Sequence, residues 1–176
     1  MTEKAGCGHA CVGIIARDNQ GRILLIERKE FPYGWAPPSG HCDGRSYPRA
    51  CFDEFETRMG LTIIGALQPL VLKNPRQNFK CRRGGVYHFW QIFQVCWQGE
   101  LKPDTSKVKN AKWCSGEEIK ILAEKTEKYL AGLKLAEQAE EESHCRALQE
   151  SIEREWQENP GLEVVWHVFF QELKII

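Results

Sequence analysis

The chain has 176 residues, 42% of them hydrophobic and 27% charged, and its 24 lysines and arginines balance its 24 aspartates and glutamates. This composition suits one domain over residues 1–176, and a net charge of zero argues against partners bound through bulk charge, such as nucleic acid. No apolar stretch is long enough to cross a bilayer, so we expect no membrane partner.

The first eleven residues lack the basic and apolar regions of a signal peptide, so a cytoplasmic location is the expectation. The chain has eight cysteines. Without export signals, these are expected to be free thiols rather than disulfides.

The first half of the chain alternates apolar runs with turn residues. Residues 11–16 and 22–28 are predicted strands that pair as a hairpin. Residues 31–44, rich in proline and glycine, are predicted to be a loop. A helix follows, with Pro48 in its first turn and Gly60 as its C-cap.

Two further strands are predicted at residues 62–72 and 86–97, followed by a polar loop at 99–112 and a short strand at 111–114. A basic loop at 74–85 joins the first two. It is expected either to be solvated or to contact a phosphate or nucleic acid through its cations, which are Arg76, Lys80, Arg82 and Arg83.

The C-terminal part is predicted to be helical. Ser115 is a candidate N-cap, and residues 119–158 predict a helical hairpin or one long helix, with Gly132 as a candidate break. Residues 159–161 stop it, and 162–173 predict a final amphipathic helix. The acidic run at 137–142 is expected to be a solvated helix face or, alternatively, a surface for a partner protein or a second copy of the chain.

The segment at residues 34–61 carries the most specific pattern, GWAPPSGHCDGRSYPRACFDEFETRMGL. It resembles the box of the Nudix family: a glycine, five residues, Glu, seven residues, Arg-Glu, an apolar residue, any residue, Glu-Glu, any residue, Gly and an apolar residue. The lead-in of Gly-Trp, Pro and Gly-His is similar too. Residues 122–132 and 156–163 resemble the tail of a bacterial and archaeal subgroup. The segment from about 133 to 155 is longer than that pattern needs, so it is expected to be an insertion within a helical arm at about 119–158.

The resemblance implies an α/β/α sandwich, with a mixed central sheet, the box helix on one side and extra C-terminal helices on the other. It also implies hydrolysis of a nucleoside diphosphate linked to another group, with Mg²⁺ or Mn²⁺. In the family, three carboxylates at i, i+3 and i+4 of the box helix share one face and hold the metal.

Aligned on Gly60, the three carboxylate positions fall on Glu54, Thr57 and Arg58. Glu54 is therefore the candidate catalytic and metal-binding residue. Arg58 lies four residues later, so it is expected to contact Glu54 and to occupy the space of the magnesium ion. A fixed cation cannot activate a bound water as a metal does, so hydrolysis is expected to be weak or lost.

Two other box positions are changed together. Arg45 stands where the family has Glu, and Asp53 stands where it has Arg. These side chains are expected to form an ion pair of reversed polarity that still ties the loop to the helix.

Several residues are candidates for ligand binding beside Arg58. Trp35 is expected either to stack on a base or to pack in the core. Arg28 ends the second predicted strand, and Gly40 matches the opening glycine of the box if the loop is one residue short. The implied ligand is nucleotide-like.

A metal site of another kind is suggested near the N-terminus. Cys7, His9 and Cys11 alternate along a predicted strand and would form half of a zinc site, completed by Cys81 or His88. A buried thiol beside a surface histidine is the simpler interpretation.

Three functions remain open from the sequence. One is a degenerate Nudix domain that binds a nucleotide-like ligand. The second is an active pyrophosphohydrolase that recruits other metal ligands, such as Asp43, Asp53 or Glu118. The third is an interaction protein that acts through its C-terminal helices.

Overall fold

The computed structural model describes residues 6–71, 76–77, 79–138 and 141–176, with residues 76–77 described by their backbone. The side chain of Arg76, residue 72 of the predicted strand 62–72, parts of the basic loop at 74–85 and parts of the acidic run at 137–142 lie outside the described residues.

The larger sheet has β1 and β7 at its centre. β1 (Ala10–Ala16) runs parallel to β7 (His88–Gln98). The antiparallel strands β4 (Ser39–His41) and β5 (Thr62–Pro69) lie outside them, and β6 (Arg76–Gln77) pairs with the start of β7. This is the mixed sheet expected from the family resemblance.

A second, antiparallel sheet has the order β3 (Trp35–Ala36), β2 (Ile23–Arg28) and β8 (Val108–Cys114). The predicted hairpin of β1 with β2 is therefore wrong, because the two strands belong to different sheets. They meet at the intervening turn, through a bridge between Arg17 and Ile23 and a hydrogen bond from the Asp18 backbone N–H to the Arg22 carbonyl. Both edges of each strand are taken by other partners, because β4 and β7 flank β1 while β3 and β8 flank β2.

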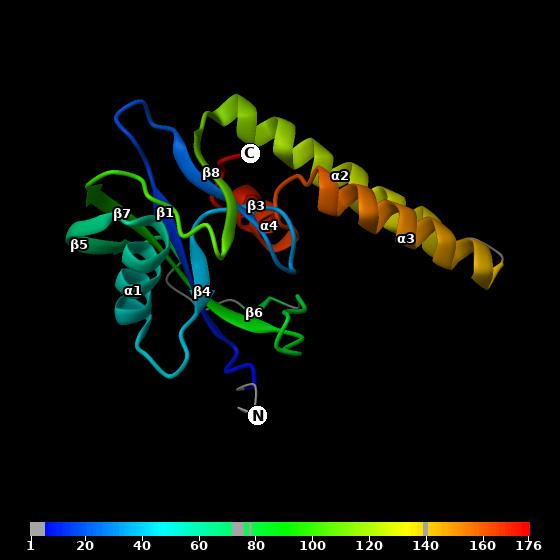
Figure 1. The fold of residues 1–176 in the computed structure, drawn as a ribbon, viewed down its shortest axis with the longest axis horizontal. Helices are drawn as coiled ribbons and strands as arrows, with labels where there is room; N and C mark the ends of the chain where they lie inside the picture. The colour runs from blue at the N-terminus through cyan, green and yellow to red at the C-terminus, as the bar shows by residue number, and fades with distance from the viewer. Residues whose placement is uncertain (1–5, 72–75, 78, 139–140) are drawn as a thin grey trace.

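Alternate residues of β1 and β2 point into two separate apolar layers. Ile15 and Leu25 face α4 (Val164–Glu172) and the start of α2 (Gly116–Glu137), whereas Ile14 and Leu24 face α1 (Tyr47–Met59). Figure 1 shows α1 and the C-terminal helices on opposite sides of the sheets, which is the α/β/α arrangement.

The box helix begins and ends where the sequence predicts. The Ser46 side chain accepts a hydrogen bond from the Arg49 backbone N–H, Pro48 lies in the first turn, and Gly60 ends the helix in the left-handed conformation at φ 66°. Its own side chains Phe55 and Met59 are fully buried on the face that packs against the sheet, so the helix is held firmly in place.

The helical segment is a hairpin of α2 and α3 (Glu142–Glu158), and Figure 1 shows it extending away from the sheets. Gly132 does not break it. This glycine lies inside α2, where a Cβ atom would come 3.3 Å from Cδ1 of Ile152, so it allows α3 to pack closely. None of the helices in the described part of the chain has the length and apolar character needed to cross a membrane.

Two predicted loops contain strands. Residues 31–44 include β3 and β4, and residues 99–112 include most of β8, which is longer than the predicted strand at 111–114. β3, β4 and β8 form because β1 and β2 offer them edges for hydrogen bonding. Neither the length nor the composition of these three segments indicates that they are strands.

Candidate functional site

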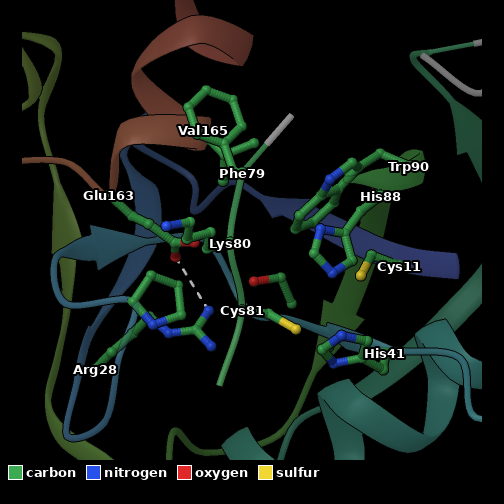
Figure 2. Close-up of a pocket in the computed structure, with 13 residues that line it drawn as sticks. Cys11, Arg28, His41, Phe79, Lys80, Cys81, His88, Trp90, Glu163 and Val165 are labelled. Atoms are coloured by element: carbon green, nitrogen blue, oxygen red, sulfur yellow. Dashed lines mark hydrogen bonds and ion pairs between the residues drawn. The ribbon is translucent and has the colours of Figure 1, made fainter. Parts of the chain in front are cut away.

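A cleft lies between the end of β2, β4, the first part of α4 and the loop at 79–85. It consists of two adjoining hollows of about 380 and 680 Å³ that share Arg28, Gly40, His41 and Cys81. Figure 2 shows the smaller one, with Arg28 and Glu163 on one side and His41 and His88 on the other, and the larger is called the outer hollow. The box helix borders the outer hollow through Glu54 and Arg58.

Glu54 is 9% exposed, and its carboxylate lies between two arginines. Arg58 Nε is 2.5 Å from Oε2, and Arg45 Nη2 is 3.8 Å from Oε1. Oε2 accepts no hydrogen bond from the described residues, so the short contact with Arg58 is an ion pair without hydrogen-bond alignment. Burial raises the pKa of Glu54, and Arg58 and Arg45 oppose that rise.

The loop before α1 is tied to the helix by Arg45. Its Nη1 is 3.0 Å from Oδ2 of Asp53, and its other nitrogens donate to the backbone carbonyls of Cys42 and His41. Arg49 contacts the second oxygen of Asp53 at 2.9 Å. Asp53 therefore contacts two cations and lies outside both hollows.

The donors present at the box helix do not fit a magnesium ion. Mg²⁺ requires several oxygen ligands in octahedral geometry. Thr57 is exposed and donates its hydroxyl to the Asp53 carbonyl of its own helix, while Arg58 contacts the one remaining carboxylate. Among the described residues, no group of three carboxylates comes within ligand distance of a common point.

The carboxylates proposed as replacement ligands are engaged elsewhere. Asp43 lines the outer hollow and accepts hydrogen bonds from Arg83, which lower its pKa. Glu118 caps α2, where it accepts from the Ser115 backbone N–H and pairs with Lys112. It lies outside the cleft.

Position 40 in β4 must be a glycine because the Glu54 carboxylate lies directly against it. A Cβ atom at position 40 would lie 2.5 Å from Oε2 and 2.6 Å from Oε1 of Glu54. Gly40 therefore makes room for the carboxylate and also lines both hollows.

We expect Gly40→Ala to lower the free energy of unfolding by about 1 to 3 kcal/mol, the usual cost of overpacking a close-packed site. In a Glu54→Ala background the same change should cost less than about 0.5 kcal/mol, because the obstructing carboxylate is gone. Urea unfolding of the four proteins measures this, with Gly116→Ala as the control, since a Cβ there meets no atom within 4 Å. Equal costs in both backgrounds would contradict the assigned contact.

A buried ion pair forms the opposite wall. Arg28 Nη1 lies 3.0 Å from Oε2 of Glu163, whose side chain is 4% exposed. Burial raises the pKa of Glu163, and the contact with Arg28 opposes this. Arg28 thus lines both hollows while neutralising the carboxylate behind it.

The cleft carries more positive than negative groups. Among the residues that the structure describes, its lining has six cations, Arg28, Arg58, Lys80, Arg82, Arg83 and Lys107, and four carboxylates, Glu30, Asp43, Glu54 and Glu163. Lys80 and Lys107 form no ion pair with any residue that the structure describes. The excess of two cations favours an anionic ligand.

Trp35 lies away from this cleft. It is 8% exposed and belongs to the core layer beneath α4, because β3 pairs with β2 and the ring turns inward. Lys112 Nζ lies 5.3 Å from its ring centroid. Of the two roles expected for Trp35, the structure places it in the core.

Sequence reasoning missed Glu163 and His41 as cleft residues. Glu163 follows the turn at 159–161 and comes to the cleft because residues 161–163 exchange backbone hydrogen bonds with Trp35. No local pattern reveals this pairing. His41 belongs to the Gly-His lead-in and could have been selected from it. Burial, followed by the charge of Arg83, lowers its pKa to about 4, so its ring is neutral at pH 7.

Residues 8–133 match the model of the NUDIX domain. A MutT NUDIX hydrolase from Burkholderia pseudomallei is 21% identical, with a TM-score of 0.52 over 62% of this chain and 84% of that one. A MutT protein from Methanosarcina mazei Go1 is 18% identical, with a TM-score of 0.50 over 88% of this chain and 98% of that one. A UDP-X diphosphatase is 14% identical, with a TM-score of 0.50 over 66% of this chain and 55% of that one. No curated protein matches the chain.

Proposed function

We propose that this chain, which belongs to the Nudix family through residues 8–133, binds a nucleotide-type ligand by its phosphates in the cleft beside α1 and hydrolyses it weakly or not at all. The family's nucleoside-diphosphate chemistry supplies the ligand class. The side chains at the edge of the cleft are the reason why we propose binding without efficient hydrolysis.

The observation that carries the proposal is the contact of Arg58 with Glu54. An arginine 2.5 Å from the only carboxylate at the three metal-binding positions neutralises it and occupies the space beside it. A guanidinium is a permanent cation that donates to phosphate oxygens, but it does not lower the pKa of a bound water. The site therefore favours phosphate binding and lacks the means to generate a hydroxide nucleophile.

We expect ADP and UDP to bind without added magnesium and to raise the melting temperature, because a ligand that binds only the native state stabilises it. Removing Lys80 and Lys107, which pair with no described residue, in Lys80→Met/Lys107→Met should weaken binding about tenfold, the equivalent of about 1.4 kcal/mol. Isothermal titration calorimetry in chelator-free buffer measures this effect.

The matched control is Lys120→Met/Lys134→Met, which removes two exposed lysines from α2, outside the cleft. Its Kd should equal that of the wild type. If neither nucleotide shifts the melting temperature of the wild type, the binding proposal is wrong.

A second candidate is a working pyrophosphohydrolase, favoured by the unused acceptor on Glu54 Oε2 and by Asp43 in the same hollow. Product analysis with a panel of nucleoside-diphosphate compounds and Mg²⁺ or Mn²⁺ separates the two functions. We expect no turnover above the buffer rate. Turnover that Glu54→Gln abolishes would establish the hydrolase and exclude the degenerate site.

A further inference from the structure

Four side chains from distant parts of the chain meet at the edge of the cleft. Cys7 precedes β1, His41 ends β4, Cys81 lies in the loop after β6, and His88 begins β7. Their ligand atoms all lie within 4.8 Å of one another. Figure 2 shows three of them, with His41 beside Cys81 and the ring of His88 above.

We propose that Cys7, His41, Cys81 and His88 bind one structural zinc ion. The site is separate from the box helix, and it does not depend on the function proposed above.

The Cys7 sulfur lies close to tetrahedral distances from both histidines. Zn–S bonds of about 2.3 Å and Zn–N bonds of about 2.0–2.1 Å place the ligand atoms of a tetrahedral site about 3.4 to 3.8 Å apart. Cys7 Sγ lies 3.4 Å from His41 Nε2 and 3.2 Å from His88 Nε2. These two distances are within a few tenths of an ångström of tetrahedral values. All four ligand atoms lie within 4.8 Å of one another, so shifts of up to about 1 Å would bring the whole set into coordination.

The surroundings orient the ligands. The Cys7 sulfur accepts a hydrogen bond from the His9 backbone N–H at 3.4 Å. Gly85 leaves the necessary space, since a Cβ atom there would lie 2.5 Å from Cys7 Sγ and 3.2 Å from His88 Nε2.

The chemistry of the set selects zinc. Two thiolates and two neutral imidazoles suit Zn²⁺ and leave the site without net charge, and four protein ligands close the coordination sphere. A closed site is structural. It would hold the loop that carries Arg82 and Arg83 against β4, and so fix one wall of the cleft.

The structure corrects the metal site expected at Cys7, His9 and Cys11, because His9 and Cys11 do not belong to the cluster. β1 begins only at Ala10 and His9 has φ 58°, so residues 7, 9 and 11 do not alternate on one strand face. His9 stacks on Tyr87 at 4.3 Å, and Cys11 is buried within the core. Cys7 remains, together with the Cys81 and His88 expected to complete a site.

The test is the zinc content of the full chain, purified in reducing, chelator-free buffer and measured by inductively coupled plasma mass spectrometry. We expect about one zinc per chain. Cys7→Ser/Cys81→Ser should reduce the zinc to background. The matched control Cys96→Ser/Cys145→Ser changes two cysteines outside the cluster and should retain it.

Cobalt titration of the metal-free wild type keeps the test valid if the cluster variant fails to fold. Co²⁺ should show the strong visible bands of a tetrahedral site and thiolate charge transfer in the near ultraviolet. The proposal is overturned if the wild type holds no zinc and cobalt shows only the weak spectrum of the aquo ion. A Cys7–Cys81 disulfide found by mass spectrometry in zinc-free protein would overturn it equally.

Discussion

Replacing Arg28 with methionine is expected to lower the free energy of unfolding at pH 7.5 by about 3 to 5 kcal/mol, the usual cost of removing one partner of a buried ion pair. Methionine keeps much of the aliphatic length but leaves Glu163 without its only ion-pair partner among the described residues. The remaining charge is then buried without compensation.

The pH dependence identifies the cause. Burial already raises the pKa of Glu163 in the folded protein above its pKa in the unfolded chain. The contribution of Glu163 to stability is therefore fully present at a pH below its pKa in the unfolded chain, and it is lost as the pH rises through its pKa in the folded protein. Losing Arg28 raises that pKa further. The difference between wild type and variant should therefore be smaller at pH 5 than at pH 7.5, where more of the buried carboxyl must ionise.

Urea unfolding followed by tryptophan fluorescence measures both values. Arg146→Met is the control, because Arg146 and Glu142 form a highly exposed pair that should matter by less than about 0.5 kcal/mol. Arg28→Met/Glu163→Met, which removes both charges, should recover at least half of the loss. A loss that is equal at both pH values would show that packing, not charge, sets the effect.

The second large effect is expected at Gly34. A Cβ atom there would lie 2.5 Å from both the Cα and the backbone nitrogen of Glu163, and its φ of 140° is a conformation that favours glycine. Backbone atoms cannot give way as a side chain can. Gly34→Ala should therefore cost about 3 to 5 kcal/mol, from strain and overpacking together.

Gly21→Ala is the matched control for this change. Gly21 also has a positive φ, 77°, but a Cβ there meets no atom within 4 Å, so its substitution should cost only about 1 kcal/mol. Unfolding free energies of the two variants measure the difference. If both cost the same, the close approach of Gly34 to Glu163 does not exist in solution.

Gly34→Ala also tests the link between fold and cleft. The new Cβ atom should displace the Glu163 backbone and so move Glu163 away from Arg28. Nucleotide binding should therefore weaken in any Gly34→Ala protein that remains folded. Gly21→Ala, which lies outside the lining of the cleft, should bind as the wild type does.

The family and the box helix could be predicted from sequence because their signals are local. The cap at Ser46, the proline in the first turn and the left-handed Gly60 specify α1 within fifteen residues. Arg58 follows Glu54 by four residues, so helical spacing alone brings the two side chains together, and the structure contains this contact. The reversed pair of Arg45 and Asp53 is also present as a contact, but Arg45 lies in the loop before α1, so helical spacing does not account for this contact.

What the sequence could not determine depends on which strand edges meet. The pairing of β1 with β4 and β7 excluded the predicted hairpin, and the contact of residues 161–163 with β3 brought Glu163 to the cleft and left Trp35 in the core. Backbone hydrogen bonds between strands carry no residue code of their own, so such pairings follow from the packing of the whole chain.

By itself, therefore, the sequence determined the family resemblance and the position of the box helix, and its alignment on Gly60 predicts that Thr57 and Arg58 replace two metal-binding acids. Only the tertiary structure decided that Cys7, His41, Cys81 and His88 lie together and that Arg28 neutralises Glu163. The first set depends on residues within a few helical turns of one another, whereas the second joins residues up to 135 positions apart, which only the packing of strands and loops can bring into contact.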